Sequence, residues 1–244
     1  MIRKHIPNFI TCLNIVSGTI AVMFAIKGLL SVAVIFIFAA AIFDFLDGML
    51  ARLLKAYSPI GKELDSLADM VSFGLAPGML MMVMIEYSLF GINTRAGNIA
   101  SLTFWEITCI ASSLLIPVAS GLRLAKFNVD SRQANSFIGL PTPANAIFIS
   151  ALALIMGYGK FGSVNTLLFQ PLVLLLLTLG MSFLLVSEIP MFSLKFKNLT
   201  WTDNRIRFIF LGLSGALIFV LNIYGIAASI ILFILISILV SMKK

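Results

Sequence analysis

The chain has 244 residues, of which 60% are apolar and only 11% are charged, and its mean hydropathy is +1.09. Soluble domains are near half apolar and about a quarter charged, so a soluble fold of this composition would have too few polar side chains to cover its surface. The composition also excludes a disordered chain and a collagen. The two cysteines, Cys12 and Cys109, both lie in apolar stretches and predict neither a disulfide framework nor a metal site. We therefore expect an integral, multi-pass membrane protein.

Eight stretches are apolar enough to predict transmembrane helices, each of which needs about 20 residues to cross the hydrocarbon layer. In chain order they cover residues 8–26, 29–52, 63–85, 101–122, 143–158, 167–187, 206–222 and 225–241. The first is preceded by basic residues, as in a signal peptide, but it runs straight into the second and lacks a small-residue cleavage site. We interpret it as a retained helix. The predicted fold class is an all-α polytopic transmembrane bundle, a single domain over residues 1–244.

Basic residues give the orientation of these spans. If the amino terminus is cytoplasmic and the chain crosses eight times, only Lys27, Arg95 and Lys160 lie on the far side, and the other fourteen of the seventeen Lys and Arg residues are cytoplasmic. We therefore expect both termini in the cytoplasm. The net charge of +7 then reflects membrane topology, and we expect no nucleic-acid partner.

Four aspartates concentrate in the second and third predicted helices. Asp44 and Asp47 are three residues apart and Asp65 and Asp69 four apart, so each pair lies on one helix face. The turn over residues 55–61 makes the two helices antiparallel neighbours, and the two faces meet near the cytoplasmic surface. Converging carboxylates repel one another unless they are protonated or hold cations. Oxygen ligands without His or Cys favour Mg²⁺ or Mn²⁺, and two such ions about 4 Å apart suit in-line displacement at phosphorus.

Two other interpretations of these aspartates stay open on spacing alone. The carboxylates are also compatible with an interfacial ion network that includes Arg52, Lys55 and Lys62. They are also compatible with a proton or cation relay in a transporter, since ionisable residues at membrane depth are typical of transport pathways. The spacing favours the metal site over both.

The aspartates belong to a longer pattern, Asp-x2-Asp-Gly-x2-Ala-Arg-x8-Gly-x3-Asp-x3-Asp, which resembles the signature of the CDP-alcohol phosphotransferases. The chain matches it at every fixed position: Asp44, Asp47, Gly48, Ala51, Arg52, Gly61, Asp65 and Asp69. These membrane enzymes move a phosphatidyl or related group from a CDP-linked donor to an alcohol and release CMP. Flanking segments resemble the membrane-embedded phosphatidylserine synthase branch of the family; they cover residues 7–18, 72–77, 123–129 and 137–144.

The resemblance implies a role for each signature residue. Two divalent cations are expected, with Asp44 and Asp65 bridging both, Asp47 completing one site and Asp69 the other. Asp69 is also implied as the catalytic base that takes the proton from the acceptor hydroxyl. Contacts with CDP-diacylglycerol are implied for seven residues: Pro7, Asn8, Phe9, Ile10, Gly48, Arg52 and Ser58.

The acceptor implied by the branch is L-serine, attacked directly at the cytoplasmic face to give phosphatidylserine. Arg123 and Lys126, with Asn128 beside them, are placed to hold the serine carboxylate or the donor phosphates; the alternative is that both cations snorkel as membrane anchors. Glycerol 3-phosphate, inositol phosphate or an ether-lipid donor also stay open. The resemblance further implies a homodimer among membrane lipids, core helices within residues 1–187 and an additional helical pair over residues 206–241.

Overall fold

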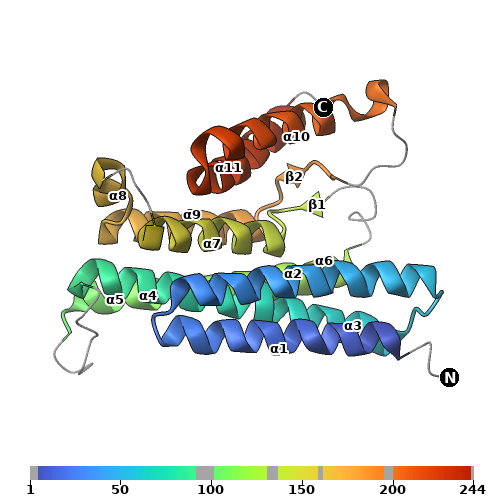
Figure 1. Ribbon diagram of the computed structural model, residues 1–244, viewed down its shortest axis with the longest axis horizontal. Coiled ribbons are helices and arrows are strands. Elements are labelled where there is room, and N and C mark those ends of the chain that lie inside the picture. The colour runs from blue at the N-terminus through green and yellow to red at the C-terminus, as the bar shows by residue number, and fades with distance from the viewer. Residues whose placement is uncertain (1–4, 92–101, 131–136, 159–161, 195–199, 243–244) are drawn as a thin grey trace.

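The protein is described by a computed structural model that covers residues 5–91, 102–130, 137–158, 162–194 and 200–242 (Figure 1). The helices are α1 (Ile6–Ile26), α2 (Leu30–Leu53), α3 (Pro59–Asp69), the π-helix η2 (Met70–Leu75), α4 (Ala76–Phe90), α5 (Phe104–Ser112), α6 (Leu115–Val129), α7 (Thr142–Tyr158), α8 (Gly162–Leu168), α9 (Pro171–Val186), α10 (Trp201–Leu221) and α11 (Ile223–Ser241). Two short strands, β1 (Phe137–Ile138) and β2 (Pro190–Met191), pair antiparallel with Phe137 opposite Met191. The predicted all-α class is confirmed.

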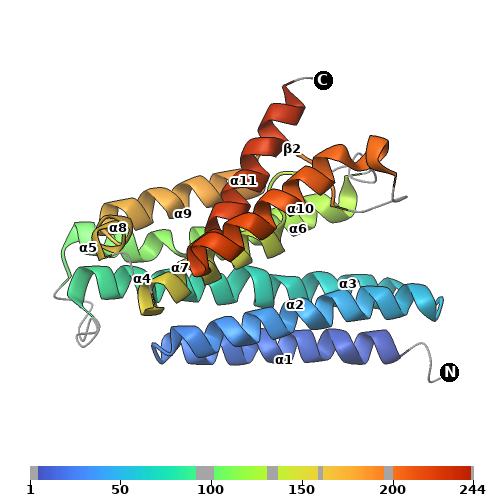
Figure 2. The same cartoon turned by 45° about the horizontal axis from the view of Figure 1, so that its top comes forward.

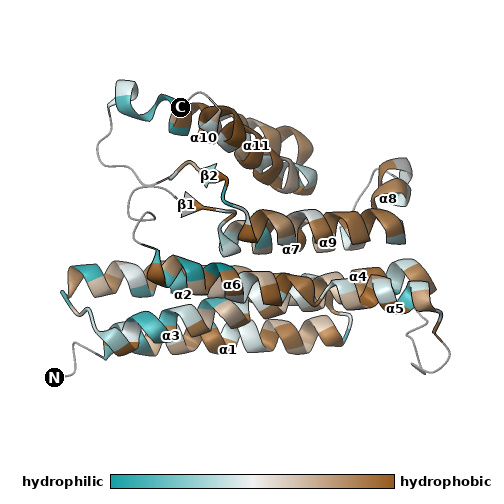
Figure 3. Ribbon diagram, turned by 180° about the vertical axis from the view of Figure 1, so that it is seen from behind, coloured by the Kyte–Doolittle hydropathy of each residue, from teal (hydrophilic) through white to brown (hydrophobic). Residues whose placement is uncertain are grey.

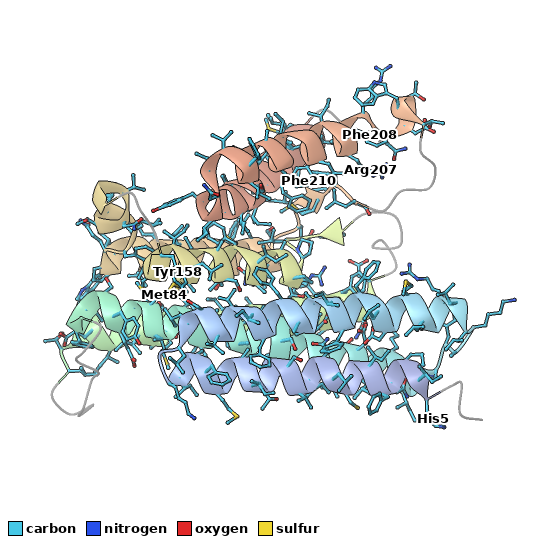
Figure 4. All side chains as sticks on the ribbon, in the orientation of Figure 1. His5, Met84, Tyr158, Arg207, Phe208 and Phe210 are labelled. Atoms are coloured by element: carbon cyan, nitrogen blue, oxygen red, sulfur yellow. The ribbon has the colours of Figure 1, made fainter. Side chains whose placement is uncertain are left out.

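The helices lie in three tiers (Figures 1 and 2). The first tier holds α1, α2, the continuous α3–η2–α4 rod and α6, and α1 packs along α2, α3 and η2. The second tier holds α7 and α9, and α7 packs against α2 and α4 below it and α11 above it. The third tier holds α10 and α11 (Figure 1). Phe210 of α10, labelled in Figure 4, and Phe233 of α11 pack on Phe192, which follows β2. Their ring centroids lie 5.5 and 4.9 Å from that of Phe192, and these contacts join the third tier to the second.

Within the described residues, six helical segments are long and apolar enough to cross a membrane, and the chain is therefore a multi-pass membrane protein. Two of these segments consist of consecutive helices: Pro59–Phe90 contains α3, η2 and α4, and Phe104–Val129 contains α5 and α6. The apolar helices α7 and α9 are shorter, with 17 and 16 residues. The count of eight spans and the orientation of the termini stay predictions. Hydrophilic residues gather at the end of the bundle that carries the amino terminus, the α2–α3 turn and the start of α10 (Figure 3).

Five predicted helix boundaries differ from the structure by four residues or more. The third span ends at Phe90 and not at residue 85, the sixth begins at Pro171 and not at residue 167, and the seventh begins at Trp201 and not at residue 206. At the other two the helix continues beyond its apolar stretch. The third span begins at Pro59 and not at residue 63, since Ser58 caps it: the Gly61 N–H donates to Ser58 Oγ at 2.9 Å, and Pro59 occupies the first turn. Gly61 consequently lies inside the helix and not in the turn. The fourth span ends at Val129 and not at residue 122. Both extensions carry polar residues toward the predicted cytoplasmic surface.

Glycines set the distance between the helices of the first tier. A methyl group at Gly18 of α1 would lie 2.9 Å from the Ser72 Cα of η2, and one at Gly78 of α4 would lie 2.8 Å from Pro117 Cδ of α6. Because glycine has no side chain, the helix backbones can approach this closely, as they do at small residues in membrane helices generally. The first contact is reinforced by Ser72 Oγ, which donates to Asn14 Oδ1 at 2.6 Å in the buried interior.

We expect Gly18→Val to destabilise the protein, because the added side chain overlaps the η2 backbone. Overpacking of this kind costs about 1–3 kcal/mol, and the free energy of unfolding falls by that amount in a detergent melt. The matched control is Gly215→Val, since no described atom lies within 4 Å of a methyl group at Gly215. Equal stability of the two variants would show that α1 and η2 are not in close contact.

Candidate metal and nucleotide site

Three of the four predicted aspartates form one cluster at the α2–α3 interface. Asp44, Asp47 and Asp65 each present a carboxylate oxygen, and these oxygens all lie within 4.8 Å of one another. Asp47 is the most enclosed, with 5% of its surface exposed, and the Thr11 hydroxyl lies within hydrogen-bonding reach of its carboxylate. The faces predicted from the spacing of three and four residues do meet.

Asp69 lies one helical turn beyond Asp65, at the last position of α3 before η2 begins. Its carboxyl group interacts with those of Asp44 and Asp65 and with the Arg123 guanidinium of α6. It is not one of the three residues whose oxygens share the 4.8 Å cluster. Asp69 therefore stands between the cluster and α6, and the π-helical turn that follows it is a feature frequently found at functional sites.

The carboxylates fit a divalent cation. Asp47 Oδ2 and Asp69 Oδ1 are buried, and neither has a hydrogen-bond partner among the described residues. Buried carboxylate oxygens without partners are costly, and three mutually repelling carboxylates increase this cost unless positive charge lies between them. Their hard oxygen ligands match Mg²⁺ or Mn²⁺.

The ion-network interpretation is not supported by the nearby basic residues. The Arg52 Nε donates to the Gly48 carbonyl oxygen one turn back, at 3.0 Å. The Lys62 Nζ donates to the Asn128 carbonyl oxygen at 3.4 Å. Within the described part of the chain, no ion pair joins either side chain to the three clustered aspartates.

A cavity of about 470 Å³ opens beside the cluster, between α1, α2 and α3. The predicted nucleotide contacts that line it are Pro7, Asn8, Gly48, Arg52 and Ser58. Phe9 and Ile10 are not among the described residues that line it, because successive residues of α1 point about 100° apart; Phe9 turns outward and is 65% exposed.

Three polar residues line the same cavity and were not predicted: Thr11, Tyr57 and Lys62. Thr11 is one turn beyond Pro7 on α1, so helical periodicity applied to the Pro7–Ile10 stretch would have found it. Tyr57 and Lys62 are placed by the conformation of the α2–α3 turn, for which the sequence carries no simple signal.

The three predicted acceptor residues diverge around α6. Arg123, 6% exposed, faces Asp69 and lies 5.1 Å from the Phe127 ring centroid. The Lys126 Nζ donates to the Val186 carbonyl oxygen at the end of α9, at 3.5 Å. The Asn128 amide donates to Ser66 Oγ of α3 at 2.8 Å. Of the three, Arg123 is the one that the fold brings to the carboxylates.

Residues 4–194 match the family model of the CDP-alcohol phosphatidyltransferases, and the chain belongs to this family. The resemblance seen in the aspartate signature is thereby confirmed, and family membership decides against the transporter. Helices α10 and α11 lie beyond the matched residues.

Curated relatives carry more particular names. The chain is 35% identical over 186 residues to the CDP-diacylglycerol–serine O-phosphatidyltransferase of Bacillus subtilis, a match that covers 76% of this chain and 89% of that protein. The Mycobacterium leprae protein of the same name is 37% identical, with 76% of this chain and 57% of the relative covered. The archaetidylserine synthase of Methanothermobacter thermautotrophicus is 32% identical, with 65% and 61% covered. The chain thus spans less than two thirds of the latter two relatives.

Proposed function

We propose that the chain transfers the phosphatidyl group of CDP-diacylglycerol to the hydroxyl of L-serine, giving phosphatidylserine and CMP. The observation that carries this proposal is the group of carboxylate oxygens within 4.8 Å of one another, opening onto a 470 Å³ cavity. That volume suits a small-molecule site. The names of these relatives all contain serine, whereas the lipid part of the name differs. This agreement supports serine as the acceptor in this chain too.

In the proposed mechanism the aspartates would hold two divalent cations, Asp44 and Asp65 as ligands of both, Asp47 of one and Asp69 of the other. When bound, the cations supply positive charge that neutralises the pyrophosphate oxygens and stabilises the departing CMP. Arg52 and Ser58 line the cavity that receives the CDP moiety. The acyl chains stay in the lipid, to which the exposed side chains of Phe9 and Phe45 present an apolar rim.

Asp69 acts as the base. The serine hydroxyl oxygen forms a bond to phosphorus, its proton passes to the Asp69 carboxylate, and the phosphorus–oxygen bond to CMP breaks with the electron pair leaving on CMP. A carboxylate is a weak base, but it need only accept the proton as the new bond forms. Arg123 interacts with the Asp69 carboxylate and places a positive charge beside it.

The proposed reaction is tested by release of CMP from purified protein in detergent, supplied with CDP-diacylglycerol, Mg²⁺ or Mn²⁺, and one alcohol at a time. We expect release with serine and not with glycerol 3-phosphate or inositol phosphate, because a phosphorylated acceptor needs a further basic pocket. Release with another alcohol alone would keep the chemistry and reject serine. An ether-lipid CDP donor, offered in parallel, identifies the lipid.

We also propose that the active site faces the cytoplasm, with α7 and α9 completing eight spans. Tyr57 lies at the α2–α3 turn, lines the cavity and is 72% exposed. In a Cys12→Ser background, Tyr57→Cys should react with a membrane-impermeant maleimide in inside-out vesicles and not in right-side-out ones. The remaining Cys109 is buried. Labelling of right-side-out vesicles alone would reverse the orientation.

The homodimer implied by the family resemblance is also proposed. The mass of the protein in nanodiscs distinguishes one copy from two, and a mass of one copy across the working concentration range would reject the dimer.

Gly48 is expected to affect the binding of CDP-diacylglycerol and not the stability of the fold. No described atom lies within 4 Å of a methyl group at Gly48, so Gly48→Ala fits within α2 and projects into the cavity. One added methylene-sized group in a binding pocket changes affinity by about 10- to 200-fold, and we expect the KM for CDP-diacylglycerol to rise within that range with an unchanged melting temperature. Gly180→Ala, which also meets no described atom within 4 Å, serves as the control. An unchanged KM would place the nucleotide elsewhere.

A further inference from the structure

The side chain of Asn145, on the first turns of α7, is buried without a partner. It is 0% exposed, and neither its Nδ2 nor its Oδ1 atom has a hydrogen-bond partner among the described residues. A buried amide that makes none of its hydrogen bonds carries a free-energy penalty, and such groups in folded proteins call for an explanation. A ligand that supplies both a donor and an acceptor would remove the penalty.

The register of α7 on α2 places Asn145 near the level of the aspartates. Near the other end of the two helices, a methyl group at Gly157 would lie 3.6 Å from Ser31 Oγ. Both helices rise about 1.5 Å per residue. Asn145 precedes Gly157 by twelve residues on α7, and Phe43 follows Ser31 by twelve residues on α2, so the two stretches have the same length. Asn145 thus lies toward the end of α2 that carries Asp44, whose carboxyl group is beside that of Asp69.

The burial pattern of α7 directs Asn145 into the bundle. Ile149 and Leu152, four and seven residues further on, share its face and are fully buried. Ile147 and Leu154 lie on the opposite face and are partly exposed. Helix α7 packs against α2, α4, η2 and α6 as well as α11, and η2 is the turn that follows Asp69 directly.

Further buried polar groups lie on α7 itself and on α6, which packs against α7. Thr142, one turn before Asn145, is 0% exposed and its Oγ1 has no hydrogen-bond partner in the described ranges. On α6, Ser120 is equally buried and its Oγ equally without a partner; a methyl group at Gly74 of η2 would lie 3.0 Å from Ser120 Cβ. Arg123 lies one turn further along α6 and interacts with Asp69. Asp69 itself does not line the nucleotide cavity.

We propose that Asn145 recognises the α-amino-acid group of the acceptor, holding its carboxylate through Nδ2 and its ammonium group through Oδ1 while the hydroxyl faces Asp69. Arg123 adds a charged donor to the carboxylate, and the Ser120 and Thr142 hydroxyls accept from the ammonium group. The site therefore takes a zwitterionic amino alcohol and discriminates against alcohols that lack either charge. The inference rests on the proposed function, because it names the residue that selects serine in that reaction.

The test compares Asn145→Ala and the similarly sized Asn145→Asp with the wild type, using L-serine, ethanolamine (no carboxylate) and 3-hydroxypropionate (no ammonium) as acceptors. A lost hydrogen bond to a charged group weakens binding by about 10- to 100-fold. We expect the KM for serine to rise by that factor in Asn145→Ala, the KM for CDP-diacylglycerol to stay unchanged, and the preference for serine over both analogues to collapse. In Asn145→Asp the repelled carboxylate should favour ethanolamine relative to serine.

Ser150→Ala is the matched control, because Ser150 is also on α7, fully buried and without a partner for its Oγ in the described structure, but projects from a different face. Its KM values and acceptor preference should equal those of the wild type. An equal fall in rate with all acceptors, or an unchanged KM for serine in both Asn145 variants, would overturn the proposal. If Asn145→Ala does not fold, Asn145→Asp alone decides by its acceptor ratio. Wild-type protein that uses no serine would instead reject the proposed function itself.

Discussion

Asp69→Asn should lower the rate of CMP release by about 10²- to 10⁴-fold, the range over which positioned acid–base groups contribute, and, at saturating Mn²⁺ that offsets the lost metal ligand, change the KM for CDP-diacylglycerol far less than kcat. The amide that replaces the carboxylate cannot accept the serine proton. Asp69 stands outside the three-carboxylate cluster and does not line the nucleotide cavity. The KM for the donor should therefore change far less than kcat.

The control for this prediction is Glu63→Gln, which removes an exposed carboxylate from the same helix. It should retain wild-type kcat. If Asp69→Asn raised the KM for CDP-diacylglycerol and kept kcat, Asp69 would be a donor-binding residue and the base would lie elsewhere. Measuring both constants at saturating Mn²⁺ separates the two cases.

The arrangement of the aspartates was predictable because it depends on local periodicity. Spacings of three and four residues place Asp44 with Asp47, and Asp65 with Asp69, on single helix faces. The short turn that ends at Ser58 forces the two helices to run side by side, so the faces had to meet. Nothing beyond helix geometry and loop length was needed for this part of the site.

The acceptor side was less predictable, because it depends on contacts between helices distant in sequence. Arg123, Lys126 and Asn128 are close in sequence, yet they turn toward Asp69, Val186 and Ser66 respectively. Which face of α6 meets which helix follows from tertiary packing. Asn145 shows the same limit, since its burial without a partner among the described residues exists only in the folded bundle.

The π-helix at Met70–Leu75 also had no sequence signal. Its position depends on tertiary contacts: Ser72 bonds to Asn14 of α1, and Gly74 touches Ser120 of α6. Both contacts join η2 to other helices, so no window of local sequence contains them. The consequence is functional, because this turn sets the direction in which α3 presents Asp69 at its end.

Removing one carboxylate from the cluster should stabilise the metal-free protein and abolish its response to metal. Asp44 interacts with Asp47, Asp65 and Asp69, so Asp44→Asn removes a negative charge that neighbours all three other carboxylates. In EDTA we expect Asp44→Asn to melt at a higher temperature than the wild type. Added Mn²⁺ should stabilise the wild type by about 2.7 kcal/mol at roughly 100 times its Kd and leave the variant unchanged.

Enzyme activity and Mn²⁺ binding complete this test. Asp44→Asn should release no measurable CMP, and the EPR signal of unbound Mn²⁺ should show weaker binding to the variant. Glu63→Gln should match the wild type in melting temperature with and without Mn²⁺, because its carboxylate is exposed and outside the cluster. A variant less stable than the wild type in EDTA would mean that the cluster is held together by hydrogen bonds between protonated carboxyl groups. In that case Asp44 would have a structural role, and the cation site would have to be sought among Asp47, Asp65 and Asp69.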